Sequence, residues 1–423
     1  MTGPLGSDLP AGTRFLGPEP GAAPRWGVGE HPLDADLATC VACGLCLPHC
    51  PTYRLTGEES ASPRGRIAAI RTIAEGRADV DPAFASYVDL CLACRACEDV
   101  CPSHVPFGRM IEAARVQIEP LRPRRARFVR WLGLRVALRR RWILSLGRVM
   151  TPLARPFVGR RVRGLIPHGN PGPRVPALTE PEGTDKGAVA ILTGCVQDQW
   201  YRGVNRSTAR VLARNGWRVL APRRQVCCGA LPAHNGRLGD ARALALRNIR
   251  AFGGVDRVVV NAAACGAQMK EYGELLGTEE AHTFSTKVVD LMEFLAADGV
   301  DPPAHDAGVD TVAYHDACHA LRVQHIREQP RTVLRSIPGT KVVDVADGDR
   351  CCGAAGLYNV TEPEMADELG RAKAEAILAT GVAIVATSNP GCAMQLAAAI
   401  RAAGGDVEVV HPVQLLDRAY GRA

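Results

Sequence analysis

The chain has 423 residues, of which 47% are hydrophobic, and its basic and acidic side chains leave a formal net charge of +7. No run of eighteen apolar residues exists and no apolar segment follows the N-terminus, so we expect neither a membrane-spanning helix nor a secretion signal. The sixteen cysteines exceed ordinary usage and point to metal chemistry. Because so many thiols would cross-link in an oxidising compartment, we expect a cytoplasmic protein.

Residues 1–30 are rich in Pro and Gly and are predicted to form a flexible N-terminal arm. Residues 31–118 follow, and they contain the spacing Cys-x2-Cys-x2-Cys-x3-Cys-Pro twice. Each copy places three thiolates on one tight loop and a fourth just after it, which suits a cubic iron–sulfur cluster. Zinc sites instead use cysteines in pairs. In two-cluster ferredoxins the fourth cysteine of each run binds the other cluster. We therefore predict two [4Fe-4S] clusters, one held by Cys40, Cys43, Cys46 and Cys101, the other by Cys91, Cys94, Cys97 and Cys50.

The segment between the two motifs is longer than a minimal ferredoxin needs. Ser62-Pro63-Arg64-Gly65 opens a stretch of helical character over residues 67–75. This resembles the helical, succinate-dehydrogenase-like form of a two-cluster module. Pro51 and Pro102 are expected to stop any helix and turn the chain away from the clusters.

Residues 119–186 are predicted to form a basic linker. Residues 120–178 contain 15 arginines and no Asp, Glu or Lys, and without them the formal charge of the chain becomes −8. Two interpretations stay open: an amphipathic helix lying on an anionic membrane surface, or a basic helix packed on an acidic protein surface. Nucleic acid is not expected, since no binding motif accompanies the charge. Apolar residues recur at helical spacing in this segment: Phe128, Trp131, Leu132, Leu138, Trp142, Leu146 and Val149.

Residues 187–423 contain an internal repeat, predicted as two domains at 187–300 and 301–423. The spacing of the cysteines barely slips between the copies, and each copy holds a Cys-Cys-Gly-Ala sequence, so the repeat indicates a duplicated domain. The first copy holds Cys195, Cys227, Cys228 and Cys265; the second holds Cys318, Cys351, Cys352 and Cys392.

Each copy alternates strand-like and helical segments, which predicts a parallel sheet with helices on both faces. Cysteines follow the expected carboxyl end of each strand, where open α/β sheets place their ligand sites. We therefore expect a mixed fold, with an α-helical two-cluster module followed by a duplicated α/β domain. The eight thiols would meet at the sheet rims and hold a further iron–sulfur cluster, zinc, or nothing permanent. Expected strands lie at residues 189–193, 217–221, 257–260, 311–314, 341–345 and 383–387.

Histidines lie beside several of these cysteines. His49 and His104 adjoin ligands of the first block; they could tune the cluster potential or pass protons, but we expect them to cap loops or face solvent. His315, Asp316 and His319 surround Cys318. They would either relay protons to a quinone or orient the Cys318 loop by hydrogen bonds.

The motifs resemble those of glycolate oxidase (glycolate dehydrogenase) iron–sulfur subunits over nearly the whole chain after residue 30. The repeated half is similar to the cysteine-rich domain of heterodisulfide reductase, lactate-utilisation proteins and anaerobic glycerol-3-phosphate dehydrogenase. That domain in heterodisulfide reductase carries a fifth cysteine, where this chain has Gln268 and Gln395. The resemblance is carried by Cys43-Gly-Leu-Cys46-Leu-Pro-His-Cys50-Pro-Thr-Tyr53, Ser62-Pro-Arg-Gly-Arg66, Gly194-Cys-Val-Gln197, Val260-Asn-Ala-Ala263, His315-Asp-Ala-Cys-His319 and Asn389-Pro-Gly-Cys392.

The resemblance implies an electron-transfer subunit. A flavoprotein dehydrogenase subunit would oxidise glycolate to glyoxylate, and this chain would pass the electrons toward a quinone or another membrane acceptor. No G-x-G-x-x-G fingerprint or Ser/His/Asp arrangement suggests a catalytic site in the chain itself. The expected location is the cytoplasm, with peripheral contact to the inner face of the cell membrane through the arginine-rich segment.

Three alternatives stay open beside this interpretation. The first is the equivalent subunit of a lactate or glycerol-3-phosphate dehydrogenase. The second is a thiol–disulfide enzyme of the heterodisulfide-reductase kind, and the third is a scaffold whose clusters only brace the fold.

Overall fold

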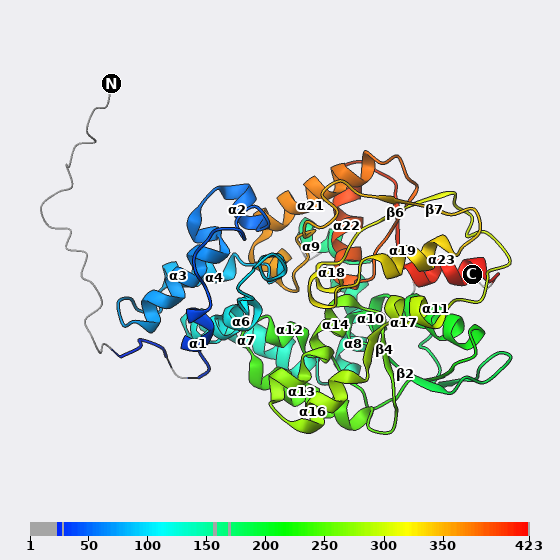
Figure 1. Cartoon of the computed structure of the whole chain (residues 1–423), viewed down its shortest axis with the longest axis horizontal. Coiled ribbons are helices and arrows are strands. Elements are labelled where there is room, and N and C mark those ends of the chain that lie inside the picture. The colour runs from blue at the N-terminus through cyan, green and yellow to red at the C-terminus, as the bar shows by residue number, and fades with distance from the viewer. Residues whose placement is uncertain (1–22, 28, 155–158, 168–170, 422–423) are drawn as a thin grey trace, which may run out of the picture.

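The computed structural model describes residues 23–27, 29–154, 159–167 and 171–421. Most of the predicted N-terminal arm lies outside the described residues. Figure 1 shows a helical N-terminal module, drawn in blue and cyan, beside two α/β units drawn in green and in yellow to red. The predicted fold class, a helical module followed by duplicated parallel sheets, is confirmed.

Among the described residues of the N-terminal module, the regular elements are all helices, joined by loops that carry the cysteines. The Ser62 hydroxyl accepts the Gly65 N–H at 2.9 Å and caps the predicted helix, with Pro63 at its first position. The expectation that Pro51 stops a helix is wrong: Pro51 begins one, because proline at a first helical position loses no hydrogen bond. The elements are α1 (Asp34–Ala38), α2 (Pro51–Thr56), η1 (Glu59–Ala61), α3 (Pro63–Ala74), α4 (Pro82–Asp89), α5 (Ala96–Asp99) and α6 (Phe107–Ile118).

The arginine-rich segment forms short helices, of which the earlier ones pack on the first α/β unit and α9 (Arg160–Leu165) contacts α22 (Pro390–Ala402) of the second. Leu134 and Leu138 are buried in that unit's core, so the segment packs as part of the fold. Its elements are η2 (Glu119–Leu121), α7 (Arg124–Arg130), the π-helix η3 (Trp131–Ala137), α8 (Arg141–Ala154) and α9 (Arg160–Leu165).

The first α/β unit carries a sheet of order β1-β3-β2-β4-β5, in which only β1 runs antiparallel to its neighbour. Its strands are β1 (Leu178–Thr179), β2 (Ala188–Leu192), β3 (Arg218–Leu220), β4 (Val258–Val260) and β5 (Val288–Asp290). Its helices are α10 (Val196–Trp200), α11 (Arg202–Arg214), α12 (Ala230–Ala233), α13 (Leu238–Ala251), α14 (Ala263–Lys270), α15 (Tyr272–Leu276), α16 (Glu279–Thr286) and α17 (Leu291–Asp298).

The second unit repeats the parallel part of this sheet in the order β7-β6-β8-β9. All six strands expected from the sequence are present, each within one residue of the expected limits. The strands are β6 (Thr311–Tyr314), β7 (Lys341–Asp344), β8 (Ile384–Ala386) and β9 (Glu408–Val410). The helices are α18 (Cys318–Val323), α19 (Glu328–Arg335), α20 (Tyr358–Thr361), α21 (Pro363–Leu378), α22 (Pro390–Ala402) and α23 (Pro412–Ala419).

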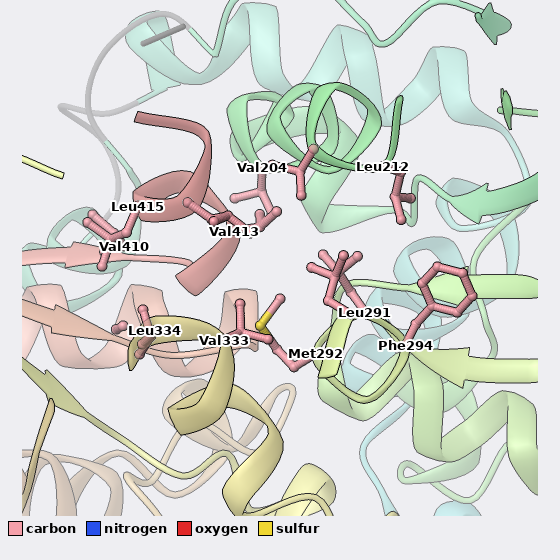
Figure 2. Close-up of a cluster of buried hydrophobic side chains, with 14 of the residues drawn as sticks. Val204, Leu212, Leu291, Met292, Phe294, Val333, Leu334, Val410, Val413 and Leu415 are labelled. Carbon is pink, nitrogen blue, oxygen red and sulfur yellow. The ribbon is translucent and has the colours of Figure 1, made fainter. Parts of the chain in front are cut away.

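The two units share one hydrophobic core, and their helices pack reciprocally. Helix α11 of the first unit is equivalent to α19 of the second, and α17 is equivalent to α23. Each packs on the partner of the other: α11 contacts α23, and α17 contacts α19. Figure 2 shows side chains of all four helices, among them Leu212, Leu291, Val333 and Val413, meeting at this seam. Burying each of these large apolar side chains contributes roughly 1.5–3 kcal/mol, which favours the packed arrangement of the two copies.

The N-terminal module contacts both units. Arg115 donates to the His234 backbone carbonyl at 2.6 Å in the first unit, and the Tyr358 hydroxyl of the second donates to the Leu90 carbonyl at 2.9 Å. Arg322 on α18 pairs with Asp99 on α5. These contacts place the second cysteine loop of the module against the thiol-bearing rims of the sheets.

Candidate metal centres

Both cysteine loops of the N-terminal module have the same unusual backbone. Ala42 and Ala93 stand two residues after the first cysteine of each motif, and both adopt a positive φ, of 57° and 51°. Gly44 and Arg95, one residue after the second cysteine, also have positive φ. A left-handed conformation at alanine or arginine is strained, and it persists only where the fold requires it. Each of these curled loops has its three cysteines along the wall of a common hollow.

The predicted thiols gather in two groups. Cys40, Cys43 and Cys46 line one small hollow together with Cys101, and Cys97 lines both this hollow and the next. A second hollow is lined by the remaining cysteines, which are Cys50, Cys91, Cys94 and Cys97. The fourth cysteine of each motif thus lies with the first three of the other, and four thiols round a hollow suit a cubic cluster.

The two groups differ in exposure. Cys43 is exposed, and its neighbours Val41 and Leu45 are 69% and 56% exposed. Cys50 and Cys91 are buried. Burial raises the pKa of the Cys94 and Cys97 thiols, so binding metal there must displace protons.

The second group lies against the second α/β unit. Leu92 belongs to a buried cluster with Cys351 and Tyr358, and Cys94 and Cys318 pack against this cluster. Thiols of the module and of the second unit are therefore neighbours in the interior.

In both α/β units the cysteines lie just after the carboxyl ends of the strands, as predicted. In the first unit Cys195 contacts Cys227, and the Cys228 and Cys265 sulfurs lie 3.1 Å apart. In the second, Cys318 contacts Cys351, and Cys352 contacts Cys392. The hydrogen bond to its partner thiol, together with burial, raises the pKa of Cys195, and likewise that of Cys318. All eight thiols line a single cavity of about 320 Å³ between the two units and the N-terminal module.

The glycines after the paired cysteines are required by the fold. Gly229 and Gly353 have φ values of 95° and 86°. A Cβ on Gly353 would also lie 2.8 Å from the Ala366 carbonyl oxygen of α21. Each glycine thus combines a left-handed backbone with close helix packing, which holds the paired thiols at the rim.

The three polar residues expected around Cys318 have separate roles. Asp316 is held by Arg331, whose nitrogens lie 2.9 and 2.7 Å from its carboxylate oxygens, so it orients the loop. His319 Nδ1 lies 3.5 Å from the Cys318 sulfur. His315 is buried beside Cys352 and Cys392, and burial lowers its pKa to about 3.

Sequence reasoning missed the residues that link this site to the rest of the chain. The His234 ring lies tilted beside that of His319, with centroids 5.1 Å apart, and its Nδ1 lies 2.6 Å from Glu112 Oε1 on α6. Arg331 and Tyr358 were also missed. None stands within a cysteine motif, so no local pattern marks them. His49 and His104 were expected to cap loops or face solvent. His49 is exposed, and His104 lies in the loop after the second motif with a left-handed backbone.

Two protein families match the parts of the chain that carry these thiols. A family described as a 4Fe-4S dicluster domain matches residues 36–105, and the cysteine-rich domain family matches residues 189–270 and 312–397. The chain is 34% identical to the probable glycolate oxidase iron–sulfur subunit of Bacillus subtilis, over 93% of this chain and 96% of that protein. The chain belongs to the family of glycolate oxidase iron–sulfur subunits.

Two further relatives support this membership. The glycolate oxidase iron–sulfur subunit of Escherichia coli is 33% identical over 92% of this chain and 95% of that protein. A subunit of the fumarate reductase (CoM/CoB) of Methanothermobacter marburgensis is 30% identical over 91% of this chain, but only 72% of that protein is covered. As a member of the family, the chain is an iron–sulfur subunit of an oxidoreductase. The predicted two-cluster module and the duplicated cysteine-rich domain are both present. Within the described ranges, no helix combines the length and apolar character needed to cross a membrane.

Proposed function

We propose that this subunit carries electrons from a flavoprotein subunit, which oxidises glycolate to glyoxylate, toward a quinone or another membrane acceptor. The observation that carries the proposal is the order of the thiol groups. An exposed group at Cys43 is followed by a buried group around Cys94, which adjoins the cavity bounded by Cys318 and Cys351. Iron–sulfur clusters bound in such a series transfer single electrons. The chain's own contribution is to fix their order and exclude water from the inner groups.

The ligand sets follow the grouping of the thiols. We assign Cys40, Cys43, Cys46 and Cys101 to the outer [4Fe-4S] cluster. Cys50, Cys91, Cys94 and Cys97 belong to the inner one. The cysteines of the two α/β units form the metal sites at the cavity. We propose the domain limits expected from the sequence: the two-cluster module at 31–118, the basic segment at 119–186, and the two α/β domains at 187–300 and 301–423.

The flavoprotein subunit is proposed to dock at the Cys43 loop. Exposed Val41 and Leu45 flank the outermost thiol there, and they offer apolar area that a partner would cover. Docking at this loop places the outer cluster site beside the partner's flavin.

The arginine-rich segment is proposed to lie on an anionic membrane surface. Many of its arginines bind the chain's own carboxylates: Arg130 pairs with Glu119, and Arg139 with Asp240. Leu134 and Leu138 are buried, but many other apolar side chains of the segment are exposed, as are Arg124 and Arg127. An exposed aromatic and aliphatic face flanked by cations suits the interface of an anionic bilayer. This face consists of Phe128, Val129, Trp131, Leu132, Trp142, Leu146, Val149, Met150 and Leu153.

A vesicle assay tests the membrane contact. The full chain should sediment with vesicles that contain anionic lipid and less with neutral ones, and Trp142→Ser with Leu146→Ser should reduce this binding. Val360→Ser removes an exposed apolar side chain elsewhere and serves as the matched control. Equal sedimentation of the double variant and the control would reject this surface.

The electron-transfer role is tested on the anaerobically purified complex. Cys94→Ser should abolish glycolate-dependent quinone reduction and lower the iron content, because metal binding and folding are linked. Ser86→Ala on α4 is the control. A Cys94→Ser complex that keeps its full iron content and full activity would overturn the proposal. Assays with lactate and glycerol 3-phosphate separate glycolate from the alternative substrates.

A second function is favoured by one observation, the eight thiols that face one cavity. Such a cavity suits thiol–disulfide chemistry, and the name of one relative includes CoM and CoB. If the isolated chain, given a reduced electron donor, cleaves a disulfide without any flavoprotein, this second function replaces the first.

A further inference from the structure

The second α/β unit holds a donor set that includes a nitrogen. His315, Cys352 and Cys392 each contribute one ligand atom, and these three atoms all lie within 4.8 Å of one another. All three residues are buried, with His315 only 1% exposed. Three donors this close can share one metal ion or one iron of a cluster, and imidazole with thiolate is a common ligand combination for zinc and iron.

His315 has an unpartnered ring nitrogen. Its Nδ1 is buried and has no hydrogen-bond partner among the described residues. A buried polar atom left without a partner costs about 1–3 kcal/mol, so a fold that retains one generally gives it a ligand. The Asp316 carboxylate next in sequence is bound by Arg331 and does not turn to the imidazole. A metal beside Cys352 and Cys392 would give this imidazole the partner that it lacks.

The first unit has no imidazole at the equivalent place. The last paired residue of β2 is Leu192, opposite Val260, and the last paired residue of β6 is Tyr314, opposite Ala386. The next residues, Thr193 and His315, are therefore equivalent. The Thr193 hydroxyl is engaged by Gln225 and by Arg141, at 3.2 and 2.9 Å. The two copies therefore differ in donor chemistry even though their four thiols match.

We propose that a ring nitrogen of His315 is a ligand of the metal in the second unit, beside Cys352 and Cys392, whereas the first unit has Thr193 at the equivalent position. This inference rests on the part of the proposed function that places metal at these thiols. Cys351, in contact with Cys352, is placed to supply a further thiolate. The shared chemistry is a mixed nitrogen–sulfur centre, which iron or zinc can occupy.

The nitrogen ligand has a consequence if the metal is iron. A neutral imidazole in place of a thiolate removes one negative charge from the centre, and histidine ligation raises the potential of iron–sulfur centres. The second unit is also the one whose thiols adjoin Cys94 of the inner group. The centre there would hold electrons more strongly than the all-thiolate groups. If the metal is zinc, the centre is redox-inert and braces the rim of the cavity.

The test uses the anaerobically purified complex, grown with either 14N- or 15N-histidine. Pulsed paramagnetic resonance reports histidine nitrogen bound to iron, and X-ray absorption at the zinc edge reports one nitrogen in a sulfur shell. Either signal should be present in the native chain. His315→Ala should remove it and speed metal loss to a chelator roughly tenfold. His319→Ala, beside the same cavity, should leave the signal unchanged.

His315→Cys keeps the assay interpretable if His315→Ala unfolds. This variant should retain the metal but show no histidine nitrogen. A nitrogen signal that persists in His315→Cys would overturn the inference, as would a native complex that lacks histidine nitrogen on both metals. Reduction of the two N-terminal clusters by glycolate is measured on the same samples. That readout tests the proposed function separately, because it does not depend on His315.

Discussion

Arg331 binds Asp316 through two nitrogens, at 2.9 and 2.7 Å, and both side chains are almost fully buried. Asp344 at the end of β7 accepts a further bond from the same guanidinium at 2.7 Å. The ion pair thus joins helix α19 to the loop that carries Cys318. Its role is to hold that loop in place, since the carboxylate is fully engaged.

Arg331→Met is expected to destabilise the second unit by about 3 kcal/mol, because it leaves Asp316 buried without its countercharge. Thermal unfolding of the purified chain measures this as a lower transition temperature. Arg335→Met on the same helix removes an exposed arginine that pairs with Glu328, and it should change stability by less than about 1 kcal/mol. Equal losses of stability in Arg331→Met and Arg335→Met would show that the buried ion pair stabilises the unit no more than the exposed one.

Gly65 is expected to tolerate no side chain. A Cβ at this position would lie 1.9 Å from the Glu59 carbonyl oxygen, closer than any real contact, so η1 and α3 would have to separate. Gly65→Ala should destabilise the N-terminal module by more than about 2 kcal/mol and reduce its iron content. Iron and sulfide analysis with thermal unfolding measures both effects.

Gly239 provides the control for this substitution. It lies in α13, and a Cβ there meets nothing within 4 Å. Gly239→Ala should be neutral or stabilise by about 0.5–1 kcal/mol, since alanine favours the helix. A Gly65→Ala chain as stable as Gly239→Ala would contradict the close approach of η1 and α3.

The strands and the two thiol groups could be predicted because their signals are local. Apolar runs such as residues 189–193 are bounded by polar or glycine-containing segments, and a Cys-x2-Cys-x2-Cys loop determines which thiols converge. The orientation of the arginine-rich segment could not be predicted. Helical spacing shows that Trp142 and Leu146 share a face, but not whether that face is buried. The answer depended on distant carboxylates such as Asp240, which draw the arginines inward.

The contacts between the two copies also could not be predicted from the sequence. The reciprocal packing of α11 on α23 and of α17 on α19 depends on apolar faces that either copy would show alone. The closeness of His315 to Cys352 and Cys392 arises from three segments that are far apart in the chain, two loops and the start of α22. His315 is close to Cys318 in the sequence, but in the folded chain it lies beside Cys352 and Cys392.

Arg66 is expected to raise the potential of the inner cluster. Its side chain is buried and lines the hollow formed by Cys50, Cys91, Cys94 and Cys97. The guanidinium donates to the Tyr87 carbonyl at 2.6 Å and to the Thr52 hydroxyl at 3.2 Å. A buried cation favours the added electron, so Arg66→Gln should lower the potential.

The size and the control of the Arg66 effect are both measurable. Loss of roughly 1 kcal/mol of charge interaction corresponds to about 40 mV for one electron. Redox titration followed by paramagnetic resonance measures the shift. Arg71 instead donates to the Leu37 and Cys40 carbonyls, near the outer group. Arg71→Gln should leave the inner potential unchanged, and an equal shift in both variants would point to a general structural change.

Asp290 is expected to make stability depend on pH. It caps α17, its Oδ1 accepts the Met292 N–H at 2.8 Å, and burial raises its pKa to about 6 from an ordinary value of 3.8. The folded chain therefore favours the protonated form. Its contribution is neutral below about pH 4, becomes unfavourable as the pH rises toward 6, and then levels at about 3 kcal/mol. Asp290→Asn keeps the capping oxygen but carries no charge.

The stability of Asp290→Asn relative to the native chain should therefore increase between pH 5 and pH 7.5, by more than about 1 kcal/mol. Transition temperatures at pH 5, 6 and 7.5 measure this trend. Asp306→Asn, in an exposed loop, is the control and should show a flat difference over the same range. A flat difference for Asp290→Asn as well would mean that the carboxyl titrates alike in the folded and unfolded chain, and burial would then place no penalty on its charge.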